Sequence, residues 1–212
     1  MFELNNVKPE PIPPVLMEQS NIWATNLNIE KGKRYLVTAP SGKGKSTFIY
    51  AMYGLRKDYS GQLSFENQDV KQFDLDNWAT IRQENVAIVF QDLRLFLNLN
   101  GLENIQLKSE LTNTKSTKQI KVMAKRLGVD TILGQTCGTM SYGQRQRIAI
   151  IRALCQPFDY LFLDEPFSHL DEANIKVACE LIEEVCEEQN SGFILVSLGE
   201  NYFLKYDETL RL

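Results

Sequence analysis

The chain has 212 residues, a length that suits one large domain or a compact domain with a smaller lobe. Its 43% apolar and 24% charged residues are typical of a globular protein, and its formal net charge of −4 argues against non-specific nucleic-acid binding. The first residues lack the pattern of a signal peptide, and no apolar run approaches the ~20 residues that span a bilayer. Any membrane role therefore has to come through a partner.

The four cysteines are expected to be reduced core residues of a cytosolic protein. No two of them form the CxxC pair of a typical zinc site. Cys179 and Cys186 lie seven residues apart on a predicted helix, so they share one face of it, which we expect to be buried.

Strands and helices are predicted to alternate along the chain. The prolines at positions 9, 11, 13 and 14 predict a stiff, extended lead-in that is not helical. After it, short apolar runs predict strands and periodic apolar positions predict helices, with Ser141 as the N-cap of one helix. In chain order these are strand 34–39, helix 45–55, strands 62–65 and 86–90, helices 118–127 and 141–154, strand 160–163, helix 171–189, and strands 193–196 and 209–212.

This alternation indicates an α/β fold, in which a mostly parallel sheet is covered by helices on both faces. Residues from about 101 to 156 are helical in character and are expected to form an inserted helical subdomain. No internal repeat interrupts this order.

One segment matches the phosphate-binding pattern G-x-x-x-x-G-K-[ST]. It consists of Ala39, Pro40, Ser41, Gly42, Lys43, Gly44, Lys45, Ser46 and Thr47. The glycines allow the backbone to curl and to aim its N–H groups at the phosphate oxygens of a nucleoside triphosphate. Lys45 can reach the β and γ phosphates, and the Ser46 hydroxyl can ligate Mg²⁺. Ala39 stands at the first glycine position, where a methyl group is tolerable only if φ is negative.

A pair of acids, Asp164 and Glu165, ends an apolar strand. Strand alternation predicts that the two carboxylates point to opposite sides. Asp164 is then expected to serve the Mg²⁺ shell, while Glu165 faces the γ-phosphate and polarises the attacking water. The alternative is a solvated acidic loop, which the phosphate-binding segment in the same chain disfavours.

Five motifs in the expected order resemble those of the ATP-binding cassette family, over nearly the whole chain. Beside the P-loop (39–47) and the Walker B strand that ends in the two acids, these are the Q-loop VFQD (89–92), the signature MSYGQRQR (140–147) and the D-loop SHLD (168–171). The resemblance implies a P-loop NTPase fold with a small N-terminal antiparallel β part. It also implies one nucleotide-binding domain over residues 1–212, whose helical subdomain carries the signature.

The resemblance implies a role for each motif. Ser141, Gly143 and Gln144 would face the γ-phosphate held by a second copy, so that two ATPs are buried between head-to-tail monomers. Gln91 would contact Mg²⁺ or the attacking water and couple that state to the helical subdomain. Asp171 would link the two composite sites across the dimer.

Three further departures from the family pattern concern Tyr142, Leu198 and the aromatic residue that stacks on adenine, which is not obvious upstream of the P-loop. Tyr142 replaces the first signature glycine, so its ring has to point away from the nucleotide or stack near it. Leu198 stands where the family has its switch histidine and cannot hydrogen-bond the γ-phosphate, so we expect slow turnover or help from another group. The one histidine, His169, is interpreted as an interface residue of the D-loop rather than a relocated switch. Trp23 is a candidate for stacking on adenine, although a core role is favoured.

Segments 75–82, 93–97 and 102–105 resemble the cassettes of lipoprotein-release, macrolide-efflux and cell-division complexes. This implies an ATPase subunit on the inner face of the cytoplasmic membrane, bound to a transmembrane permease or a mechanotransmission subunit. One alternative is a regulatory or scaffold cassette with little turnover, motivated by Ala39, Tyr142 and Leu198. The other is a soluble cassette that acts on nucleic acid or ribosomes, which the acidic balance disfavours.

Overall fold

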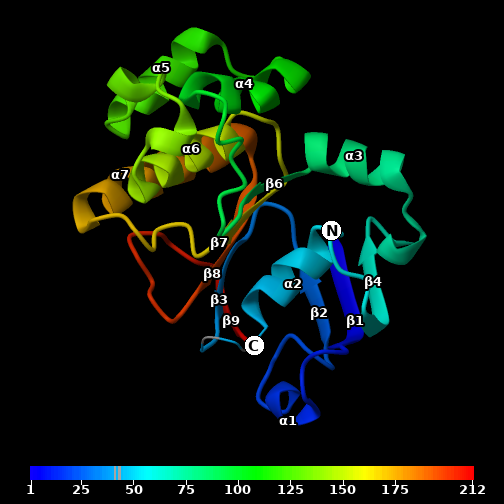
Figure 1. The fold of residues 1–212 in the computed structure, drawn as a ribbon. Helices are drawn as coiled ribbons and strands as arrows, with labels where there is room; N and C mark the ends of the chain where they lie inside the picture. The colour runs from blue at the N-terminus through cyan, green and yellow to red at the C-terminus, as the bar shows by residue number, and fades with distance from the viewer. Residues whose placement is uncertain (41, 43) are drawn as a thin grey trace.

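The computed structural model describes residues 1–40, 42 and 44–212, and within them the strands form two sheets (Figure 1). The central sheet is parallel, has the order β6-β7-β8-β3-β9, and consists of β3 (Arg34–Thr38), β6 (Val86–Val89), β7 (Tyr160–Asp164), β8 (Gly192–Ser197) and β9 (Glu208–Arg211). The smaller sheet is antiparallel, has the order β2-β1-β4-β5, and consists of β1 (Phe2–Pro9), β2 (Asn26–Ile29), β4 (Tyr59–Phe65) and β5 (Gln68–Asp69).

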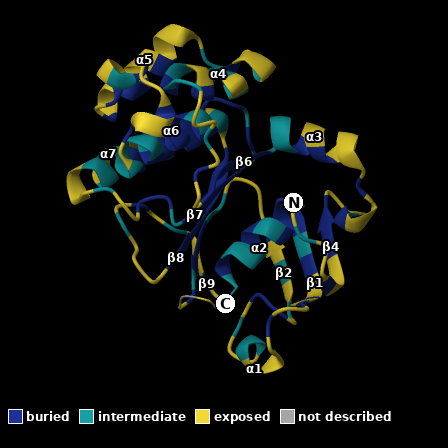
Figure 2. Ribbon diagram, viewed as in Figure 1, coloured by how far each residue is buried: buried dark blue, intermediate teal, exposed yellow. Residues whose placement is uncertain are grey.

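Strands β6, β7 and β8 are buried along their whole length because both faces of the sheet are covered there (Figure 2). Leu161 and Leu163 of β7 belong to one apolar core, whereas Tyr160 and Phe162 belong to the other, as the two-residue period of a strand requires. The strands are in register so that Asp164 pairs with Val196, which places their carboxyl ends at one edge of the sheet. That edge is where ligands bind in open α/β sheets.

The helices divide between the two faces. They are α1 (Pro14–Met17), α2 (Lys45–Met52), α3 (Leu75–Glu84), α4 (Gly101–Thr112), α5 (Thr117–Arg126), α6 (Tyr142–Leu154) and α7 (Glu172–Gln189), with short 3₁₀ turns at Val70–Gln72, Asp130–Ile132 and Cys137–Thr139. The core formed with α4 to α7 covers one face, and the core formed with α2, α3 and the small sheet covers the other. In Figure 1, α4, α5 and α6 gather at the end of the molecule opposite α1.

The α/β class, the parallel sheet with helices and the small antiparallel sheet are confirmed. Ser141 caps α6, as predicted, and all four cysteines are free and buried. The prediction that the proline-rich lead-in is not helical was wrong at Pro14, which is the first residue of α1. Proline fits there because the first N–H of a helix has no intrahelical partner to lose. No helix of the described residues has both the length and the apolar character needed to cross a membrane.

Candidate functional site

The P-loop connects the end of β3 to the start of α2. Gly42 and Gly44 have φ angles of 75° and 93°, left-handed values that favour glycine. At Gly44 a side chain would also clash, because a Cβ would lie 2.4 Å from Ile12 Cδ1. Ala39 does not have a positive φ, so its methyl group causes no left-handed strain. Two of the predicted P-loop residues lie outside the described part of the chain, Ser41 and Lys43.

The N-terminus of α2 presents free backbone donors to the loop. Gly44 is its N-cap, and no side chain of the described residues caps the first turn. The first N–H groups of a helix have no intrahelical acceptor, and the helix dipole adds positive potential there. The start of α2, with Lys45, Ser46 and Thr47, is therefore suited to phosphate oxygens.

Lys45 supplies a full positive charge beside these donors. Its side chain is 7% exposed, and its Nζ donates to the carbonyl oxygens of Ala39 and Pro40 at 3.2 and 3.4 Å. The same Nζ lies 3.2 Å from Glu165 Oε1. A phosphate at this loop would compete with Glu165 for the ammonium group.

Asp164 ends β7 and is completely buried. Neither carboxylate oxygen has a hydrogen-bonding partner of normal geometry among the described residues. Burial raises the pKa of Asp164 to about 6, the nearby Ser46 hydroxyl opposes this rise, and the Glu165 charge adds to it. A buried carboxylate with unpaired oxygens beside a hydroxyl is a set of hard oxygen ligands, which fits Mg²⁺.

The described residues contain no cluster of three or more His, Cys, Asp or Glu side chains that could hold a metal by themselves. A cation beside Asp164 would therefore also need hydroxyl, amide, water or phosphate oxygens. Mg²⁺ is usually bound in this way, through one or two carboxylates together with waters and substrate phosphates.

A backbone turn after β7, and not the alternation of a strand, sets the direction of the Glu165 side chain relative to that of Asp164. β7 ends at Asp164, and Glu165 has a left-handed φ of 48°. Its N–H donates to the Val196 carbonyl at 3.1 Å, which fixes the turn. A left-handed non-glycine residue costs about 1 kcal/mol, so this turn stores strain at the position where the carboxylate meets Lys45.

The P-loop, the Q-loop and the second acid line one cavity of about 250 Å³, the phosphate cavity. Its lining residues are Gly42, Gly44, Lys45, Ser46, Thr47, Gln91 and Glu165. Gln91 follows β6. The structure brings it to the same cavity as the P-loop residues, which lie more than 40 positions earlier in the chain, and Glu165, which lies more than 70 positions later. The signature residues do not line this cavity.

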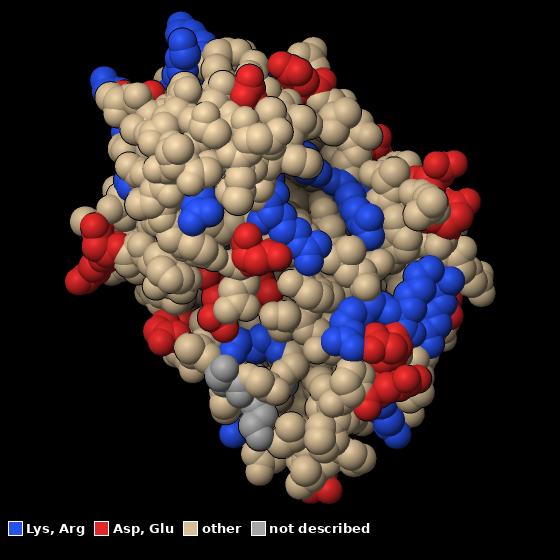
Figure 3. Space-filling model, in the orientation of Figure 1, with Lys and Arg blue, Asp and Glu red and all other residues tan. Residues whose placement is uncertain are grey.

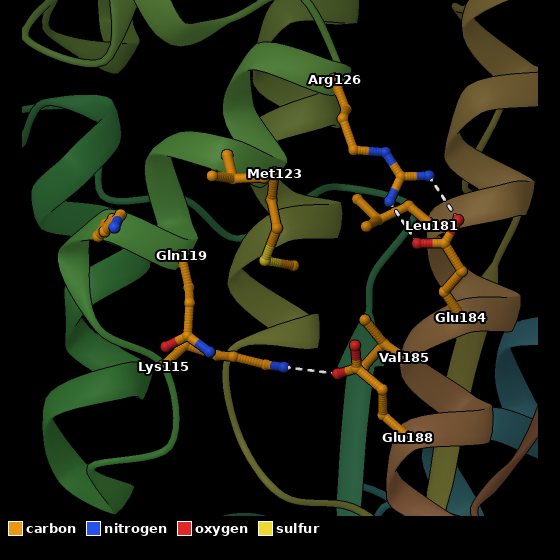
Figure 4. Close-up of a pocket in the computed structure, with 10 residues that line it drawn as sticks. Lys115, Gln119, Met123, Arg126, Leu181, Glu184, Val185 and Glu188 are labelled. Atoms are coloured by element: carbon orange, nitrogen blue, oxygen red, sulfur yellow. Dashed lines mark hydrogen bonds and ion pairs between the residues drawn. The ribbon is translucent and has the colours of Figure 1, made fainter.

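A larger cavity of about 380 Å³ lies between α5 and α7, away from the P-loop (Figure 4). Lys115 pairs with Glu188 at 2.8 Å across it, and Arg126 pairs with Glu184. These two ion pairs occupy two of the three cations that line this cavity, and the third, Lys118, has none of the convergent backbone donors found at the P-loop.

The signature forms the start of α6. The Ser141 hydroxyl accepts a hydrogen bond from the Gln144 backbone N–H at 3.2 Å, and the Gln144 side chain accepts one from the Ser141 N–H at 2.9 Å. This capping box leaves Ser141 exposed at the helix N-terminus. At Gly143 a Cβ would lie 2.8 Å from the His169 carbonyl oxygen, so glycine permits the close approach of the D-loop.

The ring of Tyr142 lies against its own D-loop. Its centroid is 4.2 Å from that of His169, and its hydroxyl donates to the Gln91 carbonyl oxygen at 2.6 Å. Asp171 caps α7 by accepting from the Asn174 N–H at 2.8 Å, and this bond lowers the pKa of its carboxyl group.

Two other positions singled out from the sequence lie apart from the phosphate cavity lining. Leu198 follows β8 and is 52% exposed. Trp23 is 1% exposed and packs edge-to-face on Phe48, with ring centroids 5.9 Å apart, so it is a core residue. Its burial leaves no ring face for adenine.

Comparison with known proteins agrees with this geometry. The sequence model of the family described as "ABC transporter" matches residues 23–168. The lipoprotein-releasing system ATP-binding protein LolD of Buchnera aphidicola subsp. Schizaphis graminum is 34% identical over 176 residues, which cover 81% of this chain and 76% of that protein. The predicted similarity to the lipoprotein-release branch is thereby supported.

Solved structures show the same fold. The dimeric structure of MJ0796, a bacterial ABC transporter cassette, has a TM-score of 0.82 and 25% identity, with 100% of this chain and 94% of that chain covered. A structure of MJ0796 in a post-hydrolysis state, bound to ADP and Pi, has a TM-score of 0.77 and 26% identity, with 93% and 88% covered. The family match, the relative and the phosphate cavity together show that the chain belongs to the ABC transporter family, as an ATP-binding cassette.

Proposed function

We propose that this cassette binds and hydrolyses ATP to drive a conformational change in a transmembrane partner. The observation that carries the proposal is the phosphate cavity, where the N–H groups at the start of α2, Lys45, Gln91 and Glu165 converge beside the buried carboxylate of Asp164, to which no described residue donates a hydrogen bond of normal geometry. The post-hydrolysis state of MJ0796 with ADP and Pi supports hydrolysis as the reaction of such a cassette.

We propose separate tasks in this reaction for the polar and charged residues at the cavity. The α2 N–H groups and Lys45 hold the phosphates, and Ser46, Gln91 and Asp164 would hold Mg²⁺. When bound, Mg²⁺ neutralises phosphate charge. Glu165 orients and polarises the attacking water once a phosphate has taken Lys45 from it.

We propose that residues 1–212 act as one domain and that two copies close head to tail around two ATPs. Support comes from the signature, because Ser141 caps α6 at an exposed helix N-terminus outside its own phosphate cavity. Such a terminus attracts anions, and it is free to meet the γ-phosphate of a second copy, with Gly143 and Gln144 beside it. The dimeric MJ0796 structure supports this arrangement.

A basic hollow lined by α4, α6 and the segment around Arg94 is the proposed contact with the membrane partner, which would hold the cassette at the inner face of the cytoplasmic membrane. Figure 3 shows Lys and Arg side chains around a hollow on this face. The cavity measures about 140 Å³. Its lining includes three cationic side chains, Arg94, Lys108 and Arg152, and two aromatic ones, Tyr53 and Phe90. Burial and the neighbouring Arg152 and Arg82 lower the pKa of Lys108.

No carboxylate of the described residues lines the basic hollow. Arg94 pairs with Asp92 at 3.4 Å, whereas Lys108 and Arg152 repel each other, and a carboxylate placed beside these two cations would relieve that repulsion. We therefore expect the partner to insert an acidic side chain there. Arg152 is already held by the carbonyl oxygens of Leu93 and Arg94 at 2.6 and 2.8 Å, so the hollow is preformed.

Turnover is proposed to be slow. Leu198 presents a half-exposed apolar side chain after β8, and it cannot donate a hydrogen bond to a γ-phosphate. This feature also favours the second candidate function, a nucleotide-dependent regulatory cassette with little hydrolysis.

Phosphate release by the purified protein tests the proposal. Wild type should release phosphate from Mg·ATP above the level of Lys45→Ala, which should lose nucleotide binding. Glu165→Gln should bind ATP with wild-type affinity and release at least 100-fold less phosphate, because only the group that polarises the water is removed. Wild-type release equal to that of Lys45→Ala would favour the regulatory cassette, and undiminished release by Glu165→Gln would refute the role of Glu165.

A further inference from the structure

Tyr142 connects three motifs within one copy of the chain. Its hydroxyl donates to the Gln91 carbonyl in the Q-loop at 2.6 Å, and its ring lies 4.2 Å, centroid to centroid, from the His169 ring in the D-loop. The residue itself is the first of α6, in the signature. A glycine at this position has no side chain and could make neither contact.

The His169 side of this contact is well anchored. The His169 N–H donates to the Gln146 side chain at 3.2 Å, and its ring nitrogen Nδ1 lies 2.9 Å from the Ser168 hydroxyl. Gln146 is 1% exposed and also donates to Ser168 at 3.4 Å. The ring of Tyr142 therefore rests on a D-loop that is fixed to α6 by hydrogen bonds to the buried Gln146 side chain.

The Gln91 side of the contact is a strained turn. Leu93 and Arg94 follow with left-handed φ angles of 62° and 45°, each of which costs about 1 kcal/mol for a non-glycine residue. Arg152 donates to both of their carbonyl oxygens. Since Tyr142 and Arg152 are both residues of α6, this helix holds the Q-loop from two points, one on each side of Asp92.

We propose that Tyr142 is a positioning residue for ATP hydrolysis. Its hydroxyl fixes the backbone at Gln91 so that the Gln91 side chain points into the phosphate cavity, and its stack on His169 ties this setting to the D-loop. The inference rests on the proposed ATPase function. Beyond that function, the inference adds a connection between the Q-loop and the D-loop that depends on the tyrosine in place of the usual signature glycine.

The test compares Tyr142→Phe with Tyr206→Phe. Both changes remove one hydroxyl that donates to a backbone carbonyl, since Tyr206 donates to Asn201 at 2.7 Å, outside the phosphate cavity. A hydrogen bond of this kind is worth about 1 kcal/mol, so Tyr142→Phe should lower kcat about fivefold with the KM for ATP changed less than twofold. Tyr206→Phe should leave both values at wild-type level.

A second substitution shows whether Tyr142 acts through Gln91. In a Gln91→Ala background, Tyr142→Phe should have no further effect on kcat, because the side chain that it positions is gone. A fivefold loss that persists in that background would overturn the proposal, as would an unchanged kcat in Tyr142→Phe or an equal loss in Tyr206→Phe.

A readout without turnover separates this inference from the proposed function. Backbone amide exchange over residues 86–97 should be faster in Tyr142→Phe than in Tyr206→Phe, because the Q-loop loses one of its two supports. Equal exchange would overturn the inference even if the wild type is an active ATPase. If wild-type phosphate release does not exceed that of Lys45→Ala, the ATPase function fails and the positioning role fails with it, whatever the exchange shows.

Discussion

Asp164→Asn should make the nucleotide-free protein more stable while abolishing its response to Mg·ATP. Asp164 is fully buried, neither oxygen is hydrogen-bonded to a described residue, and its pKa is raised from the ordinary value of 3.8 to about 6. At about 1.4 kcal/mol per pH unit, this rise corresponds to about 3 kcal/mol of folding free energy lost when the carboxyl group is ionised. Asparagine has nearly the same size and carries no charge.

The pH dependence follows from the raised pKa. The folded protein binds this proton more tightly than the unfolded chain, so the stability contributed by this group falls as pH rises from about 4 through about 6. The penalty is complete above about pH 7 and absent below about pH 4. The free energy of unfolding of Asp164→Asn should therefore exceed that of wild type by 1 to 3 kcal/mol at pH 7.5, by about half as much at pH 5, and by little near pH 4.

Urea unfolding at these three pH values, with and without Mg·ATP, measures both effects. Mg·ATP should raise the unfolding midpoint of wild type and leave that of Asp164→Asn unchanged. Asp76→Asn, which removes an exposed carboxylate of α3, is the control and should change stability by less than about 0.5 kcal/mol at every pH. A variant no more stable than wild type at pH 7.5, or a gap that does not shrink toward pH 4, would refute the reasoning.

Three further substitutions test other parts of the site. Gly143→Ala should lower the free energy of unfolding by about 1 to 3 kcal/mol, because its Cβ would lie 2.8 Å from the His169 carbonyl oxygen, whereas Gly134→Ala, which has nothing within 4 Å, should change little. Leu198→His should raise phosphate release about tenfold by adding a donor for the γ-phosphate, and an unchanged rate would show that Leu198 does not limit turnover. Lys108→Glu should reduce the amount of a polytopic membrane protein that co-purifies with the cassette from detergent-solubilised membranes. The ATPase activity of the isolated cassette should not fall, and the control Lys121→Glu, at an exposed position, should co-purify the membrane protein as wild type does.

The parallel sheet was predictable because β6, β7 and β8 are buried on both faces and are therefore nearly continuous apolar runs. The first strand of the small sheet was harder to find. The register of β1 against β4 shifts between Asn5 and Lys8, and such an irregularity interrupts the two-residue alternation that identifies a strand. Helix α3 was missed because only Trp78 and Ile81 of its ten residues are buried. Its capping box, formed by Asp74 and Asn77, was the available signal.

The site was predictable where its chemistry is local in sequence. The P-loop and the two acids can be identified from their residue types and from the apolar strand that precedes each of them. The left-handed turn at Glu165 could not be derived from strand alternation, because it depends on a bond to Val196 in the neighbouring strand. The basic hollow had no motif, since its cations at 94, 108 and 152 come from separate segments.

The position of the Tyr142 ring depends on three segments that only the fold brings together. The parallel sheet places the ends of β6 and β7 at one edge, so the Q-loop and the D-loop that follow them are neighbours, and α6 starts between them. From the sequence, a tyrosine at a glycine position of the signature could only be counted as a departure from the family pattern. In the structure its hydroxyl and its ring each find a partner in the same copy. The substitution therefore adds a connection between the Q-loop and the D-loop, and the Ser141 cap at the start of α6 is kept intact beside it.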